Sequence, residues 1–159
     1  EVLPGLKRRP EADEFSVSEL DEDVLVPRDP RRDRHTLLET TTLGGQPVYS
    51  VESVPRAGDA SPYGRIVAWI AQENYVPLRT EYYNRHQSLV KTLTYSWRQV
   101  GGEWVWDRVT AVNAINGNRT VLEQTDVRVN LGLPDELFAK RVLDQGGDGF
   151  VHRVERYFR

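Results

Sequence analysis

Polar and apolar side chains alternate along much of the chain from residue 36 onward, and this alternation predicts a series of β-strands. Between Leu89 and Val100, for example, Leu93, Tyr95 and Trp97 share one side, while the threonines and serine between them share the other. Strands are expected over the ranges 36–43, 48–54, 65–71, 76–83, 89–100, 103–115 and 119–130. Because their connections are short, they should form an antiparallel meander.

Turn residues separate these segments. Gly44-Gly45 and Gly101-Gly102 suit tight hairpin turns, and Asn116-Gly117 is a strong turn dipeptide. Pro77 cannot donate to a ladder, so we expect it at a strand start, an edge or a bulge. The fold class is therefore mainly β, with a curved antiparallel sheet and short helices.

The pattern divides the chain into an arm, a sheet domain and a tail. Residues 1–35 read as an irregular, proline- and charge-rich arm, in which Ser16 and Glu19 have the spacing of a capping box and could begin a short helix. Residues 36–143 form the expected sheet domain, which ends in a short helix over 134–143 with Pro at its first turn. Residues 144–159 form a C-terminal tail.

Composition narrows the classes of function. The 21 basic and 24 acidic side chains give a net charge of -3, which supplies no electrostatic footprint for nucleic acid. Cysteine is absent, which excludes thiolate chemistry and cysteine metal sites. No run approaches the roughly 18 to 20 apolar residues of a membrane-spanning helix.

Candidate catalytic groups are few. His35, His86 and His152 lack the spacing of metal ligands, so no metal or cofactor is expected. The carboxylates Asp107, Glu123 and Asp126 could form a hydrolytic pair, but we favour cross-strand pairing with arginines. The arginines in question are Arg98, Arg119 and Arg128. We therefore expect a protein that is not an enzyme.

Large aromatic side chains recur on successive predicted strands. In a closed sandwich they would fill the core, whereas on an open curved sheet they would line an apolar groove. By pattern alone the core is the simpler interpretation, because large aromatics most often fill interiors. The set comprises Trp69, Tyr82, Tyr95, Trp97, Trp104 and Trp106.

Several segments in order resemble the outer-membrane lipoprotein-sorting protein family, the LolA-like proteins of the bacterial envelope. The likeness covers residues 45–143. It rests on Ser61-Pro62-Tyr63-Gly64-Arg65 through Trp69-Ile70, Tyr75-Val76-Pro77-Leu78-Arg79-Thr80-Glu81-Tyr82-Tyr83, Leu89-Val90-Lys91-Thr92-Leu93, Gly101-Gly102-Glu103-Trp104, Thr120, Asp126 and Asn130-Leu131-Gly132-Leu133-Pro134-Asp135-Glu136-Leu137-Phe138.

The resemblance implies half of an incomplete β-barrel whose concave apolar face receives acyl chains. It implies a carrier or binding protein for a lipid or acylated protein. This protein would be free in the periplasm or attached to the outer membrane. A non-enzymatic adaptor of an inner-membrane transporter of the resistance-nodulation-division type is the alternative. The residues expected to line the ligand are Trp69, Leu78, Tyr82, Leu93, Tyr95, Trp97, Trp104, Trp106 and Val112.

Two departures from the family pattern shape the remaining expectations. The chain has Ala71 where the family usually has Asp after Trp-Ile, and it matches the second half of the barrel. Half a barrel would leave an edge strand open, which is an aggregation hazard. We therefore expect a homodimer, strand exchange, or coverage of the edge by the arm or by residues 150–159.

Overall fold

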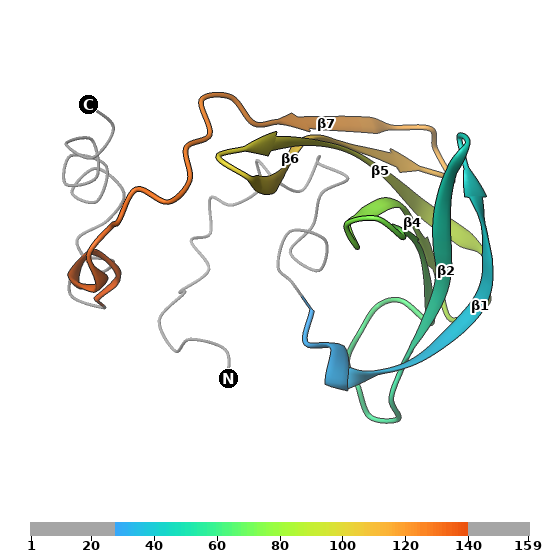
Figure 1. Cartoon of the computed structure of the whole chain (residues 1–159). Coiled ribbons are helices and arrows are strands. Elements are labelled where there is room, and N and C mark those ends of the chain that lie inside the picture. The colour runs from blue at the N-terminus through green and yellow to red at the C-terminus, as the bar shows by residue number, and fades with distance from the viewer. Residues whose placement is uncertain (1–27, 140–159) are drawn as a thin grey trace. The chain divides into compact units, whose positions relative to one another are not determined.

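The computed structural model describes residues 28–139, which form a single antiparallel sheet with two short 3-10 helices (Figure 1). Each strand pairs with its neighbours in the chain, in the order β1-β2-β3-β4-β5-β6-β7. Within this part of the chain β1 and β7 are edge strands, so the sheet is not closed. The elements are η2 (Pro30–Arg32), β1 (Asp33–Leu43), β2 (Gln46–Pro55), β3 (Arg65–Ala71), β4 (Pro77–Tyr83), β5 (Leu89–Val100), β6 (Glu103–Asn113), β7 (Arg119–Glu123) and η3 (Asp135–Phe138).

The predicted mainly β meander is confirmed, and it is consistent with an incomplete barrel. Gly101 and Gly102 both have positive φ angles, 58° and 88°, as the tight β5–β6 turn requires. Pro77 is the first residue of β4 and lies at a bulge in its pairing with β3, where its missing N–H is tolerated.

The last part of the described chain is less regular than the alternation indicates. The final strand was expected to run to residue 130, but β7 ends at Glu123. Asp126 and Asn130 have φ angles of 53° and 57°, which a strand cannot contain. Over residues 134–143 a helix was expected; Asp135–Phe138 form a 3-10 turn, and residues 140–143 lie outside the described part. The arm's short helix and the tail also lie outside it.

The strand register divides the side chains of β2 to β5 between two faces of the sheet. Trp69 pairs with Arg79, and these residues define the Trp69 face. Tyr82 pairs with Ile66 and with Lys91, and these define the Tyr82 face. The Trp69 face also carries Val48, Ser50, Glu52, Arg65, Val67, Ala71, Glu81, Tyr83, Thr92 and Thr94, and the Tyr82 face carries Leu37, Tyr49, Val51, Ser53, Ala68, Ile70, Thr80 and Leu93.

The described residues form two compact units. The first consists of residues 28–96 and 108–123 and contains β1 to β4, and the second consists of residues 97–107 and 124–139. In the first unit both faces contribute to the core: Val48 and Ala71 are fully buried on the Trp69 face, and Leu93 is fully buried on the Tyr82 face. No helix within residues 28–139 is long and apolar enough to cross a membrane.

Gly64 is required where the loop after β2 enters β3. Its N–H donates to the carbonyl of Tyr83 at 2.9 Å, and an added Cβ would lie 2.8 Å from the Cα of Arg85 and 2.9 Å from the carbonyl oxygen of Asn84. Because both atoms belong to the backbone, we expect Gly64→Ala to lower the free energy of unfolding by about 1–3 kcal/mol in urea denaturation. The exposed Ala60→Ser is the control; equal stability of the two variants would contradict the close approach.

Candidate functional site

The Tyr82 face has an aromatic centre in the first unit. The ring of Tyr63, from the loop before β3, packs on that of Tyr82 with centroids 4.7 Å apart, and Lys91 Nζ lies 5.9 Å from the Tyr63 centroid. Tyr95 follows Leu93 by two positions on β5. Burial raises the pKa of Tyr95, while its hydrogen bonds with the side chains of Thr80 and Tyr82 oppose that rise.

Apolar side chains continue this face from the aromatic centre toward β1. Leu37 pairs with Val51 and is 58% exposed. Val51 and the apolar residues beside it on β2 and β3 are half-buried, so apolar surface remains accessible across adjacent strands. The half-buried set comprises Tyr49, Val51, Ile66, Ala68 and Ile70.

The Trp69 face carries a charged network instead. Glu52 binds Arg65 at 2.5 Å, and the Arg65 guanidinium lies 4.8 Å from the ring centroid of Tyr83. The Tyr83 hydroxyl donates to the buried Glu81 at 2.6 Å, a bond that raises the pKa of Tyr83. Glu81 also pairs with Arg79, the residue opposite Trp69.

The structure separates the residues that were expected to line one ligand face. Tyr82, Leu93 and Tyr95 lie together on the Tyr82 face. Trp69 lies on the opposite face, where the Arg79 guanidinium is 5.4 Å from its ring centroid. Leu78 lies at the bulge between β3 and β4.

The remaining expected residues lie in β5 and β6. Trp97, Trp104 and Trp106 belong to the second unit, where Trp104 is 40% exposed. Val112 belongs to the first unit and pairs with Arg119 of β7. Whether any of these side chains contacts a ligand stays a prediction.

Sequence reasoning missed the aliphatic part of the Tyr82 face because it followed the aromatic residues. On β3 the available signal was the alternation of Ile66, Ala68 and Ile70, which excludes Trp69 from their face. Choosing between the two faces of this strand required the pairing with β4.

Two of the three candidate acids are paired with arginines. Asp107 accepts from Arg98 Nε at 3.0 Å, as expected, and Glu123 pairs with Arg108 of the neighbouring strand, an arginine outside the expected set. His35 lies between the Ser53 hydroxyl and the Pro30 carbonyl, each 2.8 Å from a ring nitrogen. Within residues 28–139 no three His, Asp or Glu side chains are grouped to hold a metal ion.

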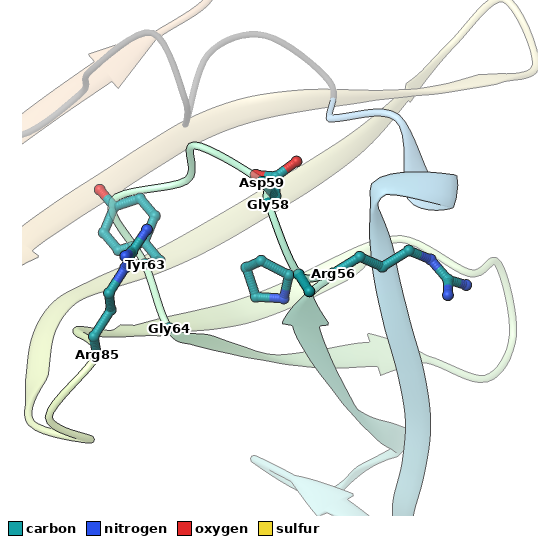
Figure 2. Close-up of a pocket in the computed structure, with 8 residues that line it drawn as sticks. Arg56, Gly58, Asp59, Tyr63, Gly64 and Arg85 are labelled. Carbon is teal, nitrogen blue, oxygen red and sulfur yellow. The ribbon is translucent and has the colours of Figure 1, made fainter.

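A shallow open pocket of about 210 Å³ lies beside the loop between β2 and β3 (Figure 2). Arg85 Nη2 donates to the Ser61 carbonyl at 3.1 Å, and Figure 2 shows the Arg85 side chain running beside Tyr63. Arg56 extends to the other side of the loop. The lining residues are Pro55, Arg56, Ala57, Gly58, Asp59, Tyr63, Gly64 and Arg85.

The one carboxylate in this lining is already neutralised by two arginines. Asp59 accepts from Arg28 and from Arg32, each at 2.7 Å. The hydrogen bond from Arg28 is the main cause that holds the Asp59 pKa at about 2. Arg28 also forms a bidentate contact with the buried Asp33 at 2.8 to 3.1 Å, which raises the Arg28 pKa.

Three solved structures are similar to this chain. A domain from Vibrio parahaemolyticus, described as an outer membrane lipoprotein-sorting protein domain, is 31% identical, with a TM-score of 0.67 over 76% of this chain and 52% of its own. A DUF1329 family protein from Desulfovibrio piger is 25% identical, with a TM-score of 0.72 over 81% and 55%. A LolA superfamily protein from Nitrosomonas europaea shares the fold at 22% identity, with a TM-score of 0.61 over 77% and 56%.

The chain therefore spans about half the length of these solved relatives. No match was found among curated proteins. A family model described as that of an uncharacterized protein matches residues 7–145, which is most of the chain. The protein thus belongs to the family that this model describes, and its similarity to LolA-like, lipoprotein-sorting proteins is confirmed.

Proposed function

We propose that this protein is a carrier or binding protein for the acyl chain of a lipid or lipoprotein, and that it acts by non-covalent binding. The observation that supports this function most directly is the partly exposed apolar surface of the Tyr82 face, which extends from Leu37 to Tyr82. A LolA-like fold among its solved relatives supports the same class of ligand. The proposal includes a place in the periplasm, because one solved relative is described as an outer membrane lipoprotein-sorting protein domain.

The chemistry of the Tyr82 face suits an acyl chain. Aliphatic side chains on neighbouring strands offer a surface that requires no directed hydrogen bonds from its ligand. A methylene chain has no hydrogen-bonding groups, so it matches such a surface. Burying one fully exposed leucine-sized side chain is worth about 1.5–3 kcal/mol. Several half-buried contacts could therefore supply micromolar affinity, which corresponds to about 8 kcal/mol, before the costs of immobilisation are subtracted.

The charged Trp69 face is a poorer candidate for an apolar cargo. Placing an acyl chain there would remove water from the Arg65–Glu52 and Arg79–Glu81 pairs. Ion pairs that lose solvent without gaining new partners bear a desolvation cost. A substitution that introduces a charge should therefore weaken acyl-chain binding when it lies on the Tyr82 face, and should leave binding unchanged when it lies on the Trp69 face.

Leu37→Asp tests the apolar face with little risk to folding, because Leu37 is 58% exposed on an edge strand. A charge at this position should weaken binding of a fluorescent fatty acid by about tenfold, through lost apolar contact and desolvation of the carboxylate. Fluorescence titration of the complete chain measures the dissociation constant.

Thr94→Asp is the matched control, since Thr94 is exposed and lies on the Trp69 face opposite Arg79. It should leave the dissociation constant unchanged. Equal weakening by both substitutions, or no binding of the fatty acid by the unaltered protein, would rule out the proposed site.

A further inference from the structure

One end of the first unit is rich in arginine although the whole chain carries a net charge of -3. This cationic end consists of residues 28–34, 55–64 and 84–88, which contain six arginines and three aspartates. The aspartates are all engaged by arginines: Asp29 with Arg31 at 2.9 Å, Asp33 with Arg28 at 2.8 Å, and Asp59 with Arg28 and Arg32 at 2.7 Å each. The local balance of +3 is therefore carried by arginines outside these pairs.

Among the described residues, Arg34, Arg56 and Arg85 have no carboxylate partner. Arg34 and Arg56 lie close together because the backbone pairing of β1 with β2 continues past the strand end. Arg34 pairs with Val54, and Arg56 N donates to the Arg32 carbonyl at 3.0 Å. Arg34 and Arg56 are thus diagonal neighbours across the two chain segments, within reach of each other's long side chains.

Both arginines line a depression of about 260 Å³. Its lining contains Arg34, Val54, Pro55, Arg56 and Ala57, and therefore holds no acidic side chain. The volume is below the roughly 300–1,000 Å³ of pockets for drug-sized ligands, so it suits a small group. The lining therefore combines two arginines, whose guanidinium groups suit a phosphate, with three apolar residues.

We propose that Arg34 and Arg56 form a binding site for a phosphate group in this depression. A guanidinium is planar, stays charged, and offers five N–H donors that match phosphate oxygens in pairs. Arg56 uses its Nε–H to donate to the Arg31 carbonyl at 3.0 Å, which fixes the side chain and leaves its terminal N–H groups for a ligand. Arg34 is exposed and supplies the second fork.

A phospholipid headgroup and free phosphate share this chemistry. Identifying the anion as a lipid headgroup rests on the proposed carrier function, whereas binding of phosphate at the site does not. If the anion is a phospholipid headgroup, the cationic end would hold the headgroup of a cargo lipid or of a membrane surface. The acyl chain would contact the Tyr82 face separately.

Titration of the complete chain with inorganic phosphate and with two kinds of vesicle tests the site. One vesicle contains anionic phosphatidylglycerol and the other only zwitterionic phosphatidylcholine. Arg34→Gln and Arg56→Gln should each weaken phosphate binding by about tenfold, the loss expected for a hydrogen bond to a charged group. Stronger binding to the anionic vesicle, with the same sensitivity to both variants, would assign the site to a lipid headgroup.

Arg119→Gln is the control, since it removes the same charge from an exposed position on β7. Thermal unfolding of each variant checks the fold, and substitutions of these exposed side chains should change stability little. The site is overturned if Arg119→Gln weakens binding as much as the other two, or if neither phosphate nor the anionic vesicle binds. Fatty-acid binding that survives such a result would preserve the proposed function and remove this site alone.

Discussion

Replacing Arg28 with methionine is expected to lower the free energy of unfolding by about 3 kcal/mol. Arg28 holds Asp33 through a bidentate contact, and the Asp33 side chain is only 4% exposed. Removing one partner of a buried pair leaves the other charge without compensation, and that loss typically costs about 3–5 kcal/mol. Because Arg28 itself is 17% exposed, the lower end of this range applies.

Arg31→Met is the matched control for this prediction. The Arg31–Asp29 pair has the same chemistry, but its side chains are 89% and 41% exposed. Exposed pairs contribute little, so the control should unfold at nearly the same urea concentration as the unaltered protein. If both variants unfolded at the same urea concentration, the cluster around Arg28 would have no special role in stability.

The same cluster makes the effect of Arg28→Met on stability depend on pH. The folded pKa of Asp59, about 2, lies below its ordinary value of 3.8, so its contribution to stability is present above pH 4 and is lost as pH falls toward 2. The hydrogen bond from Arg28 contributes most to lowering the Asp59 pKa. The difference in stability between the unaltered protein and Arg28→Met should therefore narrow between pH 4 and pH 2.

Leu93→Ala should be similarly destabilising for a different reason. Leu93 is 0% exposed on the Tyr82 face, opposite the buried Thr80, so its truncation leaves a cavity. Leucine-to-alanine changes in protein cores cost about 2–5 kcal/mol. Leu37→Ala is the control: it removes the same atoms from a 58% exposed position and should cost far less. Equal losses at the two positions would contradict the burial of Leu93.

The sheet could be predicted from the sequence because its signals are local. Strand alternation and glycine turns depend on residues close in the chain, and Arg65–Ala71 and Leu89–Val100 have the expected bounds. The end of β7 could not be predicted, because Val127 and Val129 continue the alternation past Asp126, whose backbone has a positive φ.

The two faces were harder to predict because they depend on pairing between strands. Trp69 and Tyr82 are both large aromatic residues on neighbouring strands, and only the register shows that they lie on opposite sides of the sheet. The cluster of Arg28 with Asp33 and Asp59 joins residues that are up to 31 positions apart. No motif spacing indicates such a contact.

The meander order also affects how the chain can fold. Because every strand pairs with its neighbours in sequence, each new hairpin can add to the strand formed just before it. Loop closure is then short at every step, and contacts close in sequence favour rapid folding among β proteins. A chain that emerges from its N-terminus onward could build this sheet strand by strand, without waiting for a distant partner.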